Sequence, residues 1–61
     1  MEYYVLYDLN DNIICYFDNL TEISEKFGYP IKELNRKYRN SLDDSINLVL
    51  ENAYYKLFYF K

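Results

Sequence analysis

The chain has no histidine and no tryptophan, and only one cysteine, one glycine and one proline among its 61 residues. Without histidine, it lacks the side chain that most readily serves as an acid, a base or a metal ligand near neutral pH. Cys15 alone can form neither an internal disulfide nor a thiolate metal site, and a lone cysteine is typical of a reducing compartment. We therefore expect a protein that is not an enzyme and that holds no metal and no cofactor.

Long apolar runs are also absent. No window approaches the ~18 apolar residues that a membrane-spanning helix requires. The first residues, Met1 to Tyr4, lack the basic start and apolar stretch of a secretion signal. We expect a cytoplasmic protein without membrane contact. The length predicts a single domain over residues 1–61, with a small core, because a chain of this size buries only about 60% of its surface on folding.

The composition is that of a globular protein, with 51% hydrophobic and 28% charged residues. Nine tyrosines and four phenylalanines make 21% of the chain aromatic. Ten acidic residues against seven basic ones give a formal charge of −3. Taken as a whole, this is not the basic composition of a simple nucleic-acid-binding protein.

A β-hairpin is predicted over residues 3–17. Residues 3–9 and 13–17 are rich in aromatic and β-branched side chains, which favour strands, and the Asn-Asp-Asn cluster at 10–12 favours a turn. Asp8 and Asp18 suggest that their faces of the two strands are the wetter ones, at least at the strand ends. In the second strand, alternation places three side chains on one face: Ile13, Cys15 and Phe17.

Two helices are predicted next. Asn19 followed by Glu22 has the spacing of a capping box, in which two side chains satisfy two free N–H groups at a helix start. Gly28 suits a helix end, and Pro30 suits the first turn of a second helix. Apolar residues recur at helical spacing, as Leu20, Ile23 and Phe27 in the first helix and as Ile31, Leu34 and Tyr38 in the second.

The C-terminal region has two interpretations. Residues 42–51 fit either a third helix or a strand that turns at Glu51-Asn52 and returns. We favour the second interpretation, a hairpin over residues 46–60, because its second half is strongly strand-like. The expected fold is then α+β, in the order ββ-αα-ββ, with a helix-turn-helix packed on an antiparallel sheet.

Residues 20–39 resemble the helix-turn-helix of bacterial and phage regulators. Gly28 occupies the place of the turn glycine, and Ser24 the place of the small residue where the two helices cross. Lys37 departs from the pattern, because an apolar residue is usual there, and Tyr38 is expected to take over its packing role. The usual apolar positions are filled by Ile23, Phe27, Tyr29 and Leu34.

Positive charge is concentrated in the second helix. Residues 31–40 carry four basic residues and one acidic residue, a local charge of +3, whereas the rest of the chain carries −6. The resemblance implies DNA binding by the outward side of this helix, where Arg can bind guanine, Asn can bind adenine and Lys can neutralise phosphate. The alternative is an ordinary solvated helix face. The candidate DNA-binding residues are Lys32, Asn35, Arg36 and Arg39, with Lys37 on the flank.

The whole chain resembles very small proteins of phages and mobile elements of low-GC Gram-positive bacteria. The residues that carry this resemblance are 4–8, 17–23 and 54–60. Such proteins are DNA-binding regulators or inhibitors of host defence, anti-CRISPR proteins included, so the expected partner is DNA or a host protein. A host protein would be bound through an acidic, tyrosine-rich surface, and exposed tyrosines could also stack on bases or form a protein interface. A homodimer could form through a sheet edge, because a chain this small gains core by pairing.

A calcium loop is not expected, although Asp8 to Asn12 begins like one. Ile13 replaces the glycine that such a loop needs, and Asn19 stands in the place of its bidentate glutamate.

Overall fold

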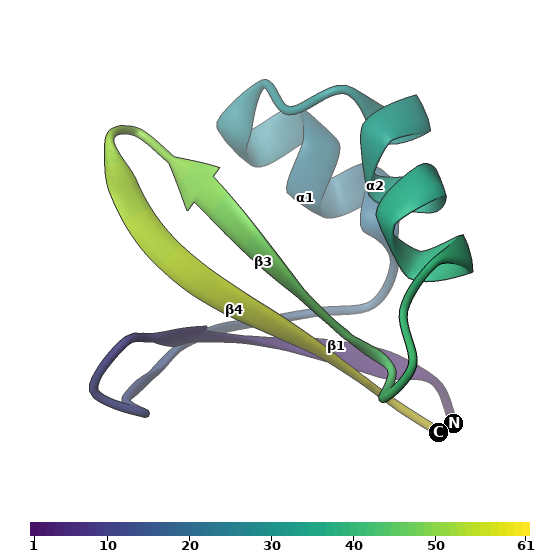
Figure 1. Cartoon of the computed structure of the whole chain (residues 1–61), viewed down its shortest axis with the longest axis horizontal. Coiled ribbons are helices and arrows are strands. Elements are labelled where there is room, and N and C mark those ends of the chain that lie inside the picture. The colour runs from purple at the N-terminus through teal and green to yellow at the C-terminus, as the bar shows by residue number, and fades with distance from the viewer.

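The computed structural model describes all 61 residues, which fold as two hairpins with a pair of helices between them (Figure 1). The order ββ-αα-ββ agrees with the prediction. The elements are β1 (Tyr3–Asp8), β2 (Ile13–Phe17), α1 (Leu20–Phe27), α2 (Ile31–Arg39), β3 (Ser45–Leu50) and β4 (Ala53–Phe60).

The four strands form one antiparallel sheet in the order β2-β1-β4-β3. The central pair, β1 and β4, joins the two ends of the chain and places Tyr3 opposite Phe60. Residues 45–50 are a strand and not a helix, which confirms the second hairpin. Its two-residue turn, Glu51-Asn52, has positive φ angles of 51° and 66°, as a tight hairpin turn of the type I′ kind requires.

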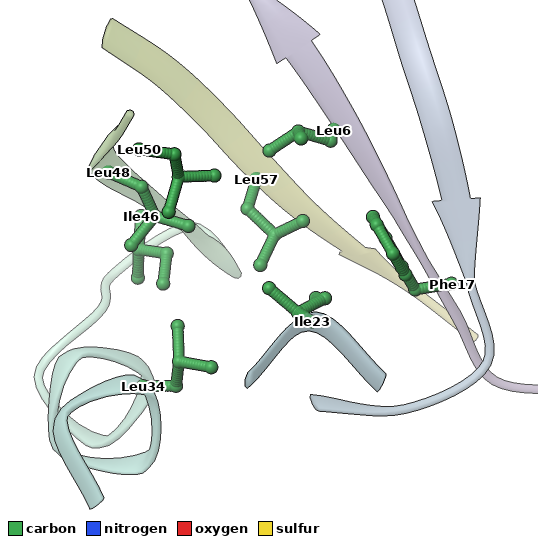
Figure 2. Close-up of a cluster of buried hydrophobic side chains, with 8 residues drawn as sticks. All are labelled: Leu6, Phe17, Ile23, Leu34, Ile46, Leu48, Leu50 and Leu57. Atoms are coloured by element: carbon green, nitrogen blue, oxygen red, sulfur yellow. The ribbon is translucent and has the colours of Figure 1, made fainter. Parts of the chain in front are cut away.

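Both helices lie on the same side of the sheet (Figure 1). Between the helices and the sheet is the main core, which is largely aliphatic (Figure 2). Ile23 of α1 and Leu34 of α2 meet Leu57 of the central strand β4, and all three are fully buried. The complete cluster is Leu6, Phe17, Ile23, Leu34, Ile46, Leu48, Leu50 and Leu57.

The prediction of the wetter faces is right for Asp18, whose face of β2 is exposed at Tyr16, but wrong for Asp8. Leu6 lies on that face of β1 and is fully buried under the helices. Asp8 itself ends the strand, because its carboxylate accepts hydrogen bonds from the backbone N–H groups of Asn10 and Asn12 at 2.8 and 3.0 Å. These bonds also lower its pKa. The polar side chain of Asp8 therefore serves the turn and does not indicate that its strand face is exposed.

The predicted faces of β2 are wrong at one end of the strand. The pairing has Leu6 opposite Cys15 but Tyr7 opposite Ile13, so Ile14 is an extra residue in a β-bulge. A bulge reverses the alternation beyond it. Ile13 therefore lies on the face of Tyr7, opposite the face of Cys15 and Phe17.

The second face of the sheet is not covered by any helix, and we call it the open face. Its aromatic rings pack against one another, as the Tyr3 and Phe60 rings stack at 5.3 Å and the Tyr7 and Phe58 rings meet edge-on at 5.3 Å. Only Val5 is fully buried there, at 2% exposure. The strand register assigns these residues to the open face: Tyr3, Val5, Tyr7, Ile13, Tyr16, Ser45, Asn47, Val49, Tyr54, Lys56, Phe58 and Phe60.

Neither helix has the length and apolar character needed to cross a membrane.

Candidate nucleic-acid interface

The first helix of the pair begins at a side-chain cap. The Asn19 carboxamide oxygen accepts a hydrogen bond from the Glu22 N–H at 3.0 Å, as the capping-box spacing predicts. The Glu22 carboxylate reaches back to the N–H of Asp18 at 2.6 Å, one residue before the cap. Both bonds fix the direction in which the chain leaves β2 and enters α1.

The turn between the helices depends on Gly28, which has a left-handed backbone with φ of 65°. A Cβ atom at this position would meet no atom within 4 Å, so glycine is needed for its backbone angle and not for space. The predicted small residue, Ser24, has a further role in the turn, because its hydroxyl donates to the carbonyl oxygen of Tyr29 at 2.6 Å. Gly28 and Ser24 therefore both shape the turn between the two helices.

The second helix starts one residue later than predicted. Pro30 precedes α2 as its cap and is not in its first turn, and its carbonyl oxygen accepts from the N–H groups of Glu33 and Leu34. Proline has no N–H group to leave unpaired at this point, and its φ of −60° is already suited to a helix start.

One side of α2 is held against the sheet. Leu34 is fully buried in the main core, and Ile31 and Tyr38 pack against it. The Tyr38 hydroxyl donates to the carbonyl oxygen of Leu57 at 3.0 Å, and burial raises the pKa of this tyrosine. Tyr38 therefore takes the packing role that Lys37 cannot fill, as expected.

The opposite side of α2 carries the predicted DNA-binding residues. Lys32, Asn35, Arg36 and Arg39 are exposed, and Lys37 is half-buried. The exposed four are spaced i, i+3, i+4 and i+7, which aligns them along one face of a helix. The three cations of the last turn also stabilise the helix, since they lie at the negative end of its dipole: Arg36, Lys37 and Arg39.

One of these cations is already paired. The Arg36 guanidinium donates to both carboxylate oxygens of Glu33, from Nη2 to Oε2 at 3.0 Å and from Nε to Oε1. This hydrogen bonding lowers the pKa of Glu33 and raises that of Arg36. The pair is exposed to solvent, so it is weak and screened by salt. It is the chain's one ion pair, and Lys32, Lys37 and Arg39 have no acidic partner.

Other polar groups singled out in the sequence form no second site. The Asp8 carboxylate uses its oxygens on the turn, including a bond from the Asn12 side chain at 3.2 Å, and no cluster of three potential metal ligands is found. Cys15 is partly buried, and its thiol faces the Tyr16 carbonyl oxygen at 3.5 Å. No pocket opens on the surface.

The open face is the feature that sequence reasoning missed. The signal was present in β4, where Tyr-Tyr-Lys-Leu-Phe-Tyr-Phe is apolar on both faces of the strand. A strand of an antiparallel sheet with one solvated face normally alternates between apolar and polar residues.

Comparison with family models, with curated proteins and with solved structures gives no match to this chain.

Proposed function

We propose that this protein binds double-stranded DNA through the exposed side of α2, as a small regulator of the helix-turn-helix kind acting in the cytoplasm. The observation that supports the proposal is the separation of the two sides of one short helix. Leu34 and Tyr38 attach α2 to the sheet, while four of the seven basic residues of the chain lie on the same helix. A helix held in this way can enter the major groove with its free side.

Within the proposed interface, the residues have different roles. Asn35 and Arg36 lie near the middle of α2, where an amide can pair with adenine and a guanidinium with guanine. Lys32, Lys37 and Arg39 neutralise phosphates and set the register of the helix on the duplex. Glu33 holds the Arg36 guanidinium through two hydrogen bonds, and DNA has to compete with this pair.

The test is fluorescence anisotropy with a labelled duplex, comparing charge reversals on and off α2. Arg39→Glu and Lys32→Glu are each expected to weaken binding on the order of ten-fold at low salt, because each removes a phosphate contact and adds repulsion. Arg36→Glu, which places a second carboxylate beside Glu33, is expected to abolish binding. Lys61→Glu makes the same charge change at the C-terminus and is the matched control. Circular dichroism checks that each variant is folded.

Equal losses for Lys61→Glu and Arg39→Glu would mean that binding follows net charge alone, and would contradict a role for α2. A wild-type protein without affinity for any duplex would do the same.

A host protein remains the second candidate partner, favoured by the exposed aromatic side chains Tyr16 and Tyr54. No acidic residue occupies a strand position of the open face, and only the Asp43 carboxylate is placed beside it, so most of the acidic surface is separate from the tyrosine-rich face. An inhibitor of host defence would use one or the other. Recovery of a stoichiometric partner from a bacterial lysate, lost in Tyr16→Glu but kept in Arg39→Glu, would support this candidate over DNA.

A further inference from the structure

The two central strands are apolar on both faces. In β1, Tyr4 and Leu6 face the helices while Tyr3, Val5 and Tyr7 face away from them. In β4, Leu57 faces the helices while Phe58 and Phe60 face away. Strands with this pattern are typical of sheets that are covered on both sides. The two helices cover only one side (Figure 1), so the residues of the open face lack the second layer that their composition fits.

Several open-face side chains remain accessible although the rings pack together. Tyr16 is 62% exposed, Tyr54 is 65% exposed and Phe60 is 37% exposed. Since an aromatic side chain can bury about 200 Å², these three rings alone offer roughly 330 Å² to a partner. Ile13 and Val49, each about half exposed, extend this area at two ends of the sheet. The three rings alone therefore offer less than half of the ~800 Å² per partner that a standard stable interface buries, and the remainder has to come from the other residues of the face.

The charge of the open face indicates which kind of partner it can bind. None of the ten acidic residues occupies a strand position of the open face, whose one charged strand residue is Lys56. One carboxylate lies beside this face, that of Asp43, which accepts a hydrogen bond from the Ser45 hydroxyl at 2.7 Å and whose pKa is lowered by that bond and by nearby Lys56. The Lys56 ammonium lies 5.6 Å from the centre of the Phe58 ring, so its stem covers apolar surface and its charge can reach the rim. Because the Asp43 carboxylate beside this face is near the Lys56 ammonium, two copies of the anionic protein can meet here with little uncompensated negative charge between them.

A single-stranded nucleic acid fits this face less well than a second copy does. Stacking platforms for single strands combine aromatic rings with a positively charged groove along the backbone. The open face has the rings but only one cation, and the cluster of cations lies on α2, on the other side of the sheet.

We propose that the open face is the docking surface for a second copy of this chain, related to the first by a two-fold axis. The two sheets then stack face to face, with the helix pairs on the outside, and Tyr16, Tyr54 and Phe60 become buried between them. A two-fold interface uses the same patch on both copies, which suits a face that is apolar and nearly uncharged. A domain of this size also gains core by pairing.

This proposal is independent of the proposed DNA binding. Because α2 lies on the covered side of the sheet, a dimer through the open face leaves both α2 helices accessible. The exposed sides of the two helices belong to opposite layers of such a dimer, so each copy would contact DNA separately.

The experiment is the mass of the full chain in solution, measured by light scattering after gel filtration across the micromolar range. The wild type is expected at about 15 kDa, twice the 7.5 kDa of the chain. Tyr54→Glu and Tyr16→Glu are each expected to give a monomer, since each places a carboxylate in the apolar interface. Leu42→Glu is the matched control, because Leu42 is fully exposed in the connector between α2 and β3. This substitution makes the same change in charge as the two tyrosine variants. It is expected to leave the dimer intact.

Every other pattern overturns the proposal. A wild type that stays at 7.5 kDa at all concentrations excludes the dimer. A dimer that persists in both tyrosine variants, or that Leu42→Glu disrupts equally, uses another surface. Tyrosine fluorescence can be measured without interference because the chain has no tryptophan. If an oligothymidine quenches this emission in a monomeric wild type and not in Tyr54→Glu, the face stacks on bases instead.

A second measurement on the wild type does not depend on any variant. NMR spectra of a dilute and a concentrated sample are expected to differ at the ring signals of Tyr3, Tyr16 and Tyr54, and to agree for Tyr38 in the main core. Changes spread over both faces, or absent from the open face, would contradict the proposed surface.

Discussion

The two faces of the sheet are built from different side chains and reach different degrees of burial. Under the helices, aliphatic residues from three strands and two helices pack together with Phe17 of β2, and Leu6 and Leu57 are inaccessible to solvent. On the open face, aromatic rings shield one another, and only Val5 is buried to the same degree. One layer of two short helices can cover one face of a four-stranded sheet and not both. The comparison shows that the helix-covered face holds the fold together, while the open face is available to a partner.

A similar division runs through α2. Its packed side is part of the main core through Leu34, and its exposed side carries cations that the core does not need. In both places, residues that the fold does not require are the ones we assign to binding.

The largest expected effect is the difference in stability between a substitution on the helix-covered face and one on the open face. Leu34→Ala removes a fully buried side chain between α2 and the sheet and is expected to lower the free energy of unfolding by about 2–5 kcal/mol. Tyr54→Ala, at an exposed open-face position, is expected to change it by about 0.5 kcal/mol or less. Urea unfolding followed by circular dichroism, at protein concentrations low enough for the monomer, measures both. Equal losses would show that the two faces contribute alike.

The next largest effect on stability is expected for a substitution in the turn between the two helices. Gly28→Ala forces a side chain into the left-handed region, at a cost of about 1–2 kcal/mol, while the added Cβ meets no neighbour. Asn52→Gly, at another positive φ angle in the β3–β4 turn, is expected to stabilise the protein, because glycine is favoured in that turn. Thermal unfolding checks the opposite signs. A neutral Gly28→Ala would contradict the conformational role of this glycine.

A smaller effect tests the polar link between α2 and the sheet. Tyr38→Phe removes the hydrogen bond to the Leu57 carbonyl oxygen and is expected to cost about 1 kcal/mol. Tyr54→Phe, on the open face, makes the same change without breaking a hydrogen bond and serves as its control.

Two tyrosine hydroxyl groups, those of Tyr38 and Tyr59, predict how stability changes at alkaline pH. Burial raises the pKa of Tyr38, and a hydrogen bond to Glu2 raises that of Tyr59 to about 12. Folding therefore retains protons that an unfolded tyrosine loses near pH 10, so this stabilisation is complete below pH 10 and is lost as the pH rises toward 12 and above. Urea unfolding at pH 8 and pH 11 is expected to show this loss in the wild type and less of it in Tyr38→Phe. An equal loss in both would contradict it.

The smallest effect concerns the exposed side of α2. Glu33→Gln releases Arg36 and removes the one acidic residue of the helix, so DNA affinity is expected to rise a few-fold with little change in stability. A loss of affinity would mean that Glu33 acts mainly by holding the Arg36 guanidinium in place. Anisotropy titrations of the wild type and Glu33→Gln at equal salt distinguish the two results.

Local chemistry was enough to predict the order of elements. The Asn19 cap, the Gly28 turn and the hairpin turn at Glu51-Asn52 each depend on a few neighbouring residues, and each is confirmed. The choice between a helix and a strand for residues 42–51 could also be made from the strand character of the segment that follows.

The side of the sheet on which each strand residue lies could not be predicted from neighbouring residues alone. The bulge at Ile14 reverses the side on which Ile13 lies, and it depends on how β2 pairs with β1. Which face the helices cover is decided by tertiary packing, so Asp8 gave the wrong answer. The side of α2 that carries the candidate residues was predictable from helical spacing, whereas the half-buried position of Lys37 and the pairing of Arg36 with Glu33 required the structure.

The most direct test of the central claim, that the exposed cations of α2 form the working surface, is the salt dependence of duplex binding by the wild-type protein. The three phosphate contacts of Lys32, Lys37 and Arg39 predict that the logarithm of the affinity falls with the logarithm of the salt concentration at a slope of about −2.7, or roughly 40-fold between about 50 and 200 mM salt. Arg39→Glu is expected to reduce the slope by about 1. A wild-type slope near zero, or a slope that Arg39→Glu leaves unchanged, would contradict the account.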